Sequence, residues 1–144
     1  MKQIQFYISV LISVFLLAGC QRSGYYEEGE QKIIDDLTQK NWTRNYKFDF
    51  DGKTYEGQET YTFKKDGSVT LKVKEVDSDG EVHETTRTHQ WAFYTPDFSV
   101  LYFNFGTYWQ LRDLTPPKLS VTEIVGEYNG LTSLRTNKEF TISK

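Results

Sequence analysis

The sequence predicts an all-β chain, an eight-stranded antiparallel meander that closes into a barrel, with one short N-terminal helix. Short runs of alternating apolar residues recur along the chain, and each run ends in Gly, Pro, Asp or Asn. Local turns of this kind suit a meander, and closing the sheet removes its exposed edges. A two-sheet sandwich is the alternative, with the loops near Pro116 and Gly126 as its crossing connections.

The helix is predicted over residues 30–39, where Ile33, Ile34 and Leu37 recur at helical spacing. A helix of this length is marginal alone in water. We therefore expect it to lay its apolar stripe on the barrel.

Two central hairpins have the same turn chemistry, Lys65-Asp66-Gly67 and Ser78-Asp79-Gly80. Both suit a three-residue loop whose glycine takes a positive φ. This loop fixes the register and places Arg87 and His89 on the inner face, unless a bulge flips the strand between Glu84 and Trp91. The predicted opposite pairs are Phe63 with Val69, Tyr61 with Leu71, Val73 with Thr85, Leu71 with Arg87, and Val69 with His89.

The next two turns are predicted as two-residue turns at Pro96-Asp97 and Gly106-Thr107. In that register the inner face that carries Trp91 and Phe93 continues into Val100, Tyr102, Trp109 and Leu111. The outer face then carries three large apolar side chains, Leu101, Phe103 and Phe105. Because these residues need a cover, we expect the helix to lie over them.

The first twenty residues have the pattern of a secretory signal peptide. One Lys near the start is followed by an apolar run over 8–17 and the ending Leu17-Ala18-Gly19-Cys20. This ending resembles the bacterial lipobox, which implies cleavage before Cys20 and acylation of its thiol. We therefore expect a lipoprotein signal peptide (1–19), a lipidated tether (20–29) and a barrel domain (30–144), held at the cell envelope by acyl chains in the outer membrane, on its periplasmic side or at the cell surface.

Composition narrows the function classes. The chain has 144 residues, a formal net charge of -3 and one Cys. The mild acidity argues against nucleic acid as a partner. The sequence has no Gly-x-Ser-x-Gly, no His-Glu-x-x-His and no phosphate-binding Gly loop, and a lipidated Cys20 leaves no thiol nucleophile. We expect neither an enzyme nor a cofactor.

A metal site is not predicted either. His83, His89 and Glu81 share one strand face, but the two imidazoles stand roughly 20 Å apart at about 3.4 Å per residue. That distance is too long for one zinc ion.

Arg87 is the most informative polar residue on the predicted inner face. A buried guanidinium must be paired, so it forms an ion pair with Glu59, turns outward, or anchors the acidic or polar head of a ligand. The aromatic side chains of that face line a ligand pocket or fill the barrel. They are Tyr46, Phe48, Tyr61, Phe63, Trp91, Phe93, Tyr102 and Trp109, and the candidate ligand-binding residues are Arg87, His89, Tyr46, Tyr61, Trp91, Tyr102 and Trp109.

Several motifs together resemble the lipocalin-like domains of Bacteroides-type lipoproteins over roughly residues 37–121. They are Leu37-Thr38, Trp42, Tyr61-Thr62-Phe63, Lys65-Asp66-Gly67, Trp91, Tyr108-Trp109-Gln110-Leu111, Leu114-Thr115 and Leu119. The resemblance implies a small calycin-type barrel whose base is closed by a tryptophan of the first strand, here Trp42. Lys40-Asn41-Trp42 stands where true lipocalins have Gly-x-Trp.

Two functional hypotheses follow. The first is a lipid-anchored, non-catalytic barrel that binds a small amphipathic molecule between its aromatic wall and a polar end. The second is a solid-core interaction module that contacts a protein partner through its loops or outer face, as inhibitors of similar shape do.

Overall fold

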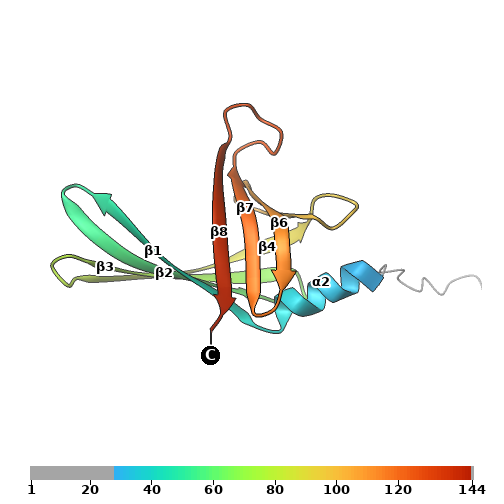
Figure 1. Ribbon diagram of the computed structural model, residues 1–144, viewed down its shortest axis with the longest axis horizontal. Helices are drawn as coiled ribbons and strands as arrows, with labels where there is room; N and C mark the ends of the chain where they lie inside the picture. The colour runs from blue at the N-terminus through green and yellow to red at the C-terminus, as the bar shows by residue number, and fades with distance from the viewer. Residues whose placement is uncertain (1–27, 144) are drawn as a thin grey trace, which may run out of the picture.

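The computed structural model describes residues 28–143 as one helix followed by a closed antiparallel barrel (Figure 1). Each strand pairs with the next, and β8 returns to β1, so the predicted meander barrel is confirmed and the sandwich is excluded. The elements are α2 (Glu28–Thr38), β1 (Asn41–Phe50), β2 (Lys53–Phe63), β3 (Ser68–Asp77), β4 (Val82–Phe93), β5 (Val100–Phe103), β6 (Thr107–Thr115), β7 (Lys118–Val125) and β8 (Leu134–Ile142).

The register of the two central hairpins is confirmed. Gly67 and Gly80 both have positive φ, 84° and 85°, at the third loop position. All five predicted pairs are present, including Leu71 with Arg87. The ladder of β3 and β4 runs without a shift, so no bulge turns Arg87 to the other face.

The predicted register of β5 is wrong by one residue. The chain between β4 and β5 makes a longer loop over residues 95–99, closed by the Tyr94 N–H donating to the Val100 carbonyl, with Phe98 at φ 58°. Leu101 and Phe103 therefore point into the barrel, fully buried, while Tyr102 lies on the outside.

The next two turns also differ from prediction. Gly106 ends a three-residue loop of the kind seen at Gly67, because Phe103 pairs with Thr107. The Pro116-Pro117 segment, with a cis peptide bond, is a tight turn and not the crossing connection that the alternative sandwich would need, since Thr115 pairs directly with Lys118. These two turns bring β6 and β7 into the wall of the barrel.

The helix closes one end of the barrel. Leu37 is fully buried in the core, with Ile33 and Ile34 packed against it, and the Trp42 Nε1–H donates to the Leu37 carbonyl at 3.0 Å. Figure 1 shows α2 at the lower end of the barrel. The helix therefore plugs this end and does not cover an outer patch of Leu101, Phe103 and Phe105 as predicted.

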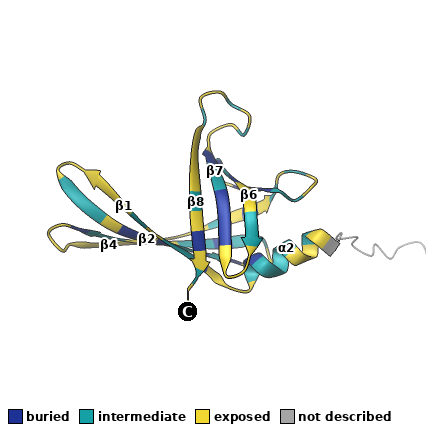
Figure 2. Cartoon of the chain, viewed as in Figure 1, coloured by how far each residue is buried: buried dark blue, intermediate teal, exposed yellow. Residues whose placement is uncertain are grey.

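The barrel wall is complete at one end and open at the other. In the described chain, β8 pairs with β1 at Trp42 and Thr43, and β5 pairs with β4 over Trp91–Phe93. The remaining lengths of β1–β4, residues 44–59 and 72–90, form a twisted four-stranded sheet that runs out to the left in Figure 1. We call this sheet the arm. Figure 2 shows that most of it is exposed or half-buried.

Within residues 28–143, no helix combines the length and the apolar character needed to cross a membrane.

Candidate functional site

The closed end of the barrel is filled with aromatic rings. Trp109 is fully buried, with its ring 4.5 Å from Tyr61, 5.0 Å from Phe140 and 5.1 Å from Phe103, measured between centroids. Phe63 packs edge-on to Trp91 at 5.6 Å. Three predicted ligand-binding residues, Tyr61, Trp91 and Trp109, are therefore core residues that fill space at this end.

A set of charged residues lies on the inner face directly beside this aromatic base. We call it the charged shelf: Arg44, Glu59, Glu123 and Lys138. The Lys138 ammonium is 3.2 Å from Glu59 and 3.0 Å from Glu123, and the Arg44 Nε–H donates to Glu59 at 2.8 Å. The side chains are 9–23% exposed. Because two cations meet two carboxylates, the shelf is balanced and carries no net charge.

Two aromatic side chains of the base, Trp109 and Tyr61, have polar groups near the shelf. The Trp109 Nε1–H donates to Glu123 at 3.1 Å. Burial, reinforced by the nearby carboxylates of Glu59 and Glu123, raises the pKa of the Tyr61 hydroxyl well above its ordinary value. The hydroxyl therefore stays protonated across the physiological range and serves as a neutral polar group.

Tyr46 lies beside the shelf on the inner face of the arm. Its ring lies over Gly57, where a Cβ atom would come within 2.3 Å of the ring, and the Arg44 guanidinium stands 5.0 Å from the ring centroid. The hydroxyl donates to Glu75 at 2.6 Å. Burial, together with this bond to Glu75, raises the pKa of Tyr46. Tyr46 is thus held in place as part of the wall.

Arg87 lies on the inner face of the arm and not in the barrel interior, and it is exposed to solvent, so the expected buried guanidinium is not observed. It lines an open cleft of about 210 Å³ with Leu71, Val73 and Thr85, which we call the Arg87 cleft. The predicted ion pair of Arg87 with Glu59 is wrong, because Glu59 pairs with Arg44 and Lys138. None of the ion pairs among the described residues includes Arg87.

The other predicted site residues are dispersed. His89 is half-buried, with its ring 4.4 Å from the Phe105 ring between centroids, and it does not line the Arg87 cleft. Tyr102 packs against Tyr108 on the outer face, which follows from the one-residue shift of β5. Cys20 lies outside the described residues. Of the predicted ligand-binding residues, Arg87 and Tyr46 therefore line clefts, and only Arg87 does so beside apolar side chains on the inner face of the arm.

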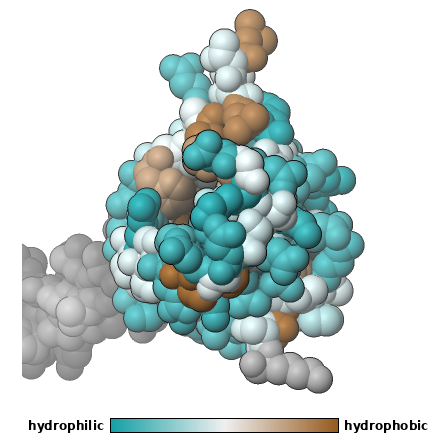
Figure 3. All heavy atoms as spheres, turned by 90° about the vertical axis from the view of Figure 1, so that its left-hand side faces the viewer, coloured by the Kyte–Doolittle hydropathy of each residue, from teal (hydrophilic) through white to brown (hydrophobic). Residues whose placement is uncertain are grey.

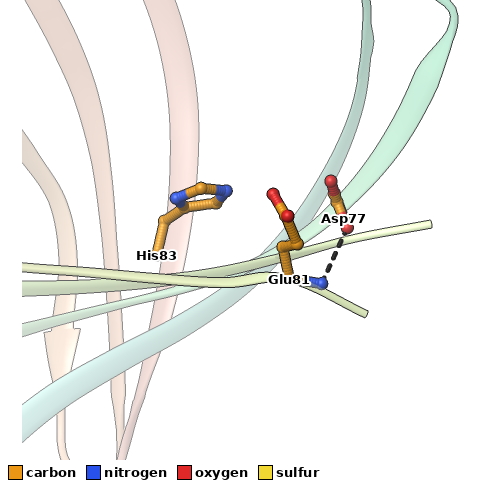
Figure 4. A group of neighbouring side chains, drawn as sticks. All are labelled: Asp77, Glu81 and His83. Carbon is orange, nitrogen blue, oxygen red and sulfur yellow. Dashed lines mark hydrogen bonds between the residues drawn. The ribbon is translucent and has the colours of Figure 1, made fainter. Parts of the chain in front are cut away.

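The tip of the β3–β4 hairpin brings Asp77, Glu81 and His83 together, with one potential metal-ligating atom of each within 4.8 Å of the others (Figure 4). Asp77 is already satisfied. One oxygen accepts the N–H groups of Asp79 and Glu81, and the other accepts the Lys53 ammonium at 2.9 Å. The bond from Lys53 lowers the pKa of Asp77. With a cation in contact, this carboxylate serves the turn and is poorly placed to bind a metal.

The outer face of the arm is polar. An open cleft of about 690 Å³ there is lined by Asn45, Tyr46, Lys47, Glu56, Gly57, Gln58, Lys74 and Val76. Acidic and basic side chains are mixed along it, and one pair, Lys47 with Glu56, is joined at 3.3 Å. Figure 3, which faces the arm, shows a mostly hydrophilic surface with separate hydrophobic patches. This face offers solvated charge and no dry pocket.

The charged shelf was missed at the level of the sequence, although part of its signal was present. Arg44 lies two residues from both Trp42 and Tyr46, and Lys138 lies two residues from Phe140. Residues two apart on a strand share a face, so both cations can be assigned to the inner face. What alternation cannot show is that closure of the barrel brings Lys138 to Glu59 of β2. The pairing follows from the whole topology.

Comparison with known proteins found a structural likeness but no family. No family model matches the chain, and no curated protein matches it. Among solved structures, the chain is similar to a de novo designed fluorescence-activating beta barrel, at 19% identity, over 72% of this chain and 89% of that one, with a TM-score of 0.32.

Proposed function

We propose that this chain is a lipid-anchored, non-catalytic binding barrel of the cell envelope that holds a small amphipathic acid in the Arg87 cleft. The observation that supports it best is the state of Arg87. Its guanidinium has no acidic partner among the described residues, yet it lies beside the apolar side chains of Leu71 and Val73. A cation next to an apolar surface matches a ligand with a carboxylate head and a hydrocarbon tail.

The chemistry of recognition follows from the guanidinium. Its planar fork donates two parallel hydrogen bonds to a carboxylate, and charge-assisted bonds of this kind are stronger than neutral ones. The cleft, at about 210 Å³, is smaller than the roughly 300–1,000 Å³ of typical ligand sites. It therefore suits the head and first carbons of a chain, with the remainder lying along the open inner face of the arm.

Octanoate and octanol make a matched pair of probes for this site. We expect octanoate to bind more tightly than octanol, and Arg87→Ala to weaken octanoate binding by roughly tenfold or more while leaving octanol unchanged, because one charge-assisted contact is lost. Isothermal titration calorimetry on the full chain in detergent measures both.

Arg112→Ala is the matched control, since Arg112 is also exposed and has no ion pair among the described residues. Equal binding of octanoate to the wild type and to Arg87→Ala would rule out the cleft as the head-group site. Equal binding of octanoate and octanol to the wild type would show that the acid is not recognised.

The membrane anchor has an independent test. The ending Leu17-Ala18-Gly19-Cys20 supports acylation of Cys20. We expect the full chain to incorporate labelled palmitate in a bacterial host and to pellet with membranes, and Cys20→Ser to lose both properties. A mature chain whose first residue is not an acylated Cys20 would remove the anchor from the proposal and leave the cleft untouched.

A specific observation also favours the second candidate, a solid-core interaction module. The closed end is packed with rings around Trp109, so the barrel interior in the described chain holds side chains where a lipocalin holds a ligand. Native mass spectrometry of the full chain distinguishes the two functions. A retained small molecule supports the binding barrel, and a clean apo mass supports the module.

A further inference from the structure

The outer edge of β1 in the arm has no strand beside it. β8 leaves β1 after Thr43, and Figure 1 shows the two strands parting beyond the base of the barrel. The Asn41 carbonyl accepts the Ser143 N–H, so the odd-numbered residues of β1 turn their backbone groups toward this side. Lys47 and Asp49 therefore present N–H and C=O groups at an edge that no described strand covers.

The side chains of this edge are complementary to themselves. In an antiparallel pairing of two copies centred on Phe48, Lys47 of one copy faces Asp49 of the other, and Tyr46 faces Phe50. The two-fold axis repeats each contact. A pairing centred on Lys47 sets two lysines opposite each other, and one centred on Asp49 sets two carboxylates opposite each other. Of these three alignments, only the one centred on Phe48 sets Lys47 opposite Asp49 on both sides of the axis.

The backbone agrees with this alignment. Lys47 and Asp49 both point their hydrogen-bonding groups outward, so each faces the other in a hydrogen-bonded pair of the new ladder. Phe48 then occupies a non-hydrogen-bonded pair, where opposite side chains come closest. No residue has to change face for this ladder to form.

The exposed aromatic side chains are what the pairing covers. Phe48 is 38% exposed and Phe50 68%, which is high for phenylalanine on a sheet. Phe48 already stacks on Tyr55 with ring centroids 4.9 Å apart. Pairing two copies places the Phe48 rings of the two copies next to each other across the axis. On the outer face, Lys47, which lies 3.3 Å from Glu56, then also faces Asp49 of the second copy.

We propose that β1 is a homodimerisation edge, through which two copies of this chain pair antiparallel around Phe48 and join their arms into one continuous sheet. Unpaired edges are templates for strand addition, and this one has the charge order for a second copy. Because the paired segment is short, the dimer is weak and reversible, well below the area of a standard stable interface.

Disulfide trapping tests the alignment. In Phe48→Cys the two thiols meet at the axis, with Cα atoms about 4.5 Å apart, within the range that a disulfide spans. In Phe50→Cys, on a more exposed residue of the same strand, the two Cα atoms lie roughly 13 Å or more apart. With the full chain in detergent under mild oxidation, we expect a dimer band on a non-reducing gel for Phe48→Cys and not for Phe50→Cys, with the wild type recording any contribution of Cys20.

Charge reversal gives a second measurement that does not depend on the aromatic residues. In the Phe48→Cys background, Asp49→Lys sets two lysines opposite each other and should cut the trapped dimer roughly tenfold. Adding Lys47→Asp restores opposite charges and should restore the yield. Both positions are solvent-exposed, and each loses only one exposed contact, Lys47 with Glu56 and Asp49 with the Thr54 hydroxyl, so we expect each variant to melt within a few degrees of the wild type, which circular dichroism checks.

Three outcomes would overturn the proposal. They are the absence of a Phe48→Cys dimer, equal trapping at Phe48 and Phe50, and a failure of Lys47→Asp to rescue Asp49→Lys. The first is also the result expected if residues 1–27 of the same chain, or a foreign strand, cover this edge. None of these outcomes bears on octanoate binding by Arg87, so the two proposals stand or fall separately.

Discussion

Trp109→Ala is expected to lower the free energy of unfolding by about 3–5 kcal/mol, which is the range for removing a large aromatic side chain from a packed core. Trp109 is fully buried and contacts the rings of Tyr61, Phe103 and Phe140. Its loss leaves a cavity at the centre of the base and removes the N–H that Glu123 accepts. Urea unfolding followed by far-ultraviolet circular dichroism measures the change.

Tyr102→Ala is the control, because it removes a large aromatic side chain outside the core. It also tests the register of β5. Tyr102 lies on the outer face, half-buried against Tyr108, so its removal should cost about 1 kcal/mol, the scale of one aromatic pair. If Tyr102 pointed inward, as the sequence predicted, its cost would approach that of Trp109. Similar losses for the two variants would contradict the observed packing.

The parts of the fold that could be predicted are those fixed by local turn chemistry. Gly67 and Gly80 set the register of β2–β4, and that register placed Arg87 opposite Leu71 correctly. Gly106 ends the same kind of three-residue loop, Asn104-Phe105-Gly106. The prediction of a two-residue turn at Gly106-Thr107 did not use this similarity. The signal was present in the sequence but assigned to the wrong turn length.

The loop before β5 is a different case. The length of this loop depends on Phe98, which has a positive φ of 58°. Bulky residues rarely adopt this conformation, so the sequence contains no signal for it. One residue of difference there exchanged the two faces of β5 and moved Leu101 and Phe103 from the expected surface into the core. The apolar outer surface that the helix was expected to cover therefore does not form.

The candidate site was predictable to the extent that it is local. Arg87 lies on the inner face as the hairpin required, but its surroundings depend on where the barrel wall ends. β5 pairs with β4 only over Trp91–Phe93. In the part of the chain that the structure describes, no strand therefore pairs with β4 beside Arg87, which is left in an open cleft. Glu59 is already paired with Arg44, its cross-strand neighbour in the β1–β2 hairpin, and with Lys138, which only closure of the barrel brings to it.

Lys138→Met is expected to lower the free energy of unfolding by about 3 kcal/mol, the lower end of the range for removing one partner of a buried ion pair. The substitution keeps the apolar stem and deletes the ammonium that lies between Glu59 and Glu123. Glu59 retains Arg44, but Glu123 is left with the Trp109 N–H alone, and a buried and a half-buried carboxylate lie close together without the cation between them. Urea unfolding at neutral pH measures the loss.

The matched control for this prediction is Lys118→Met, one strand away from Lys138. Lys118 is 51% exposed and stands 3.8 Å from Glu139, itself 74% exposed, so its removal should change stability by less than about 1 kcal/mol. Adding Glu123→Gln to Lys138→Met should recover part of the stability, because it removes the carboxylate left without its cation. Equal losses for the two lysine variants, or a double variant that is less stable than Lys138→Met, would show that the charged shelf does not depend on the Lys138 ammonium. The shelf would then be ordered by Arg44 and the aromatic base beneath it.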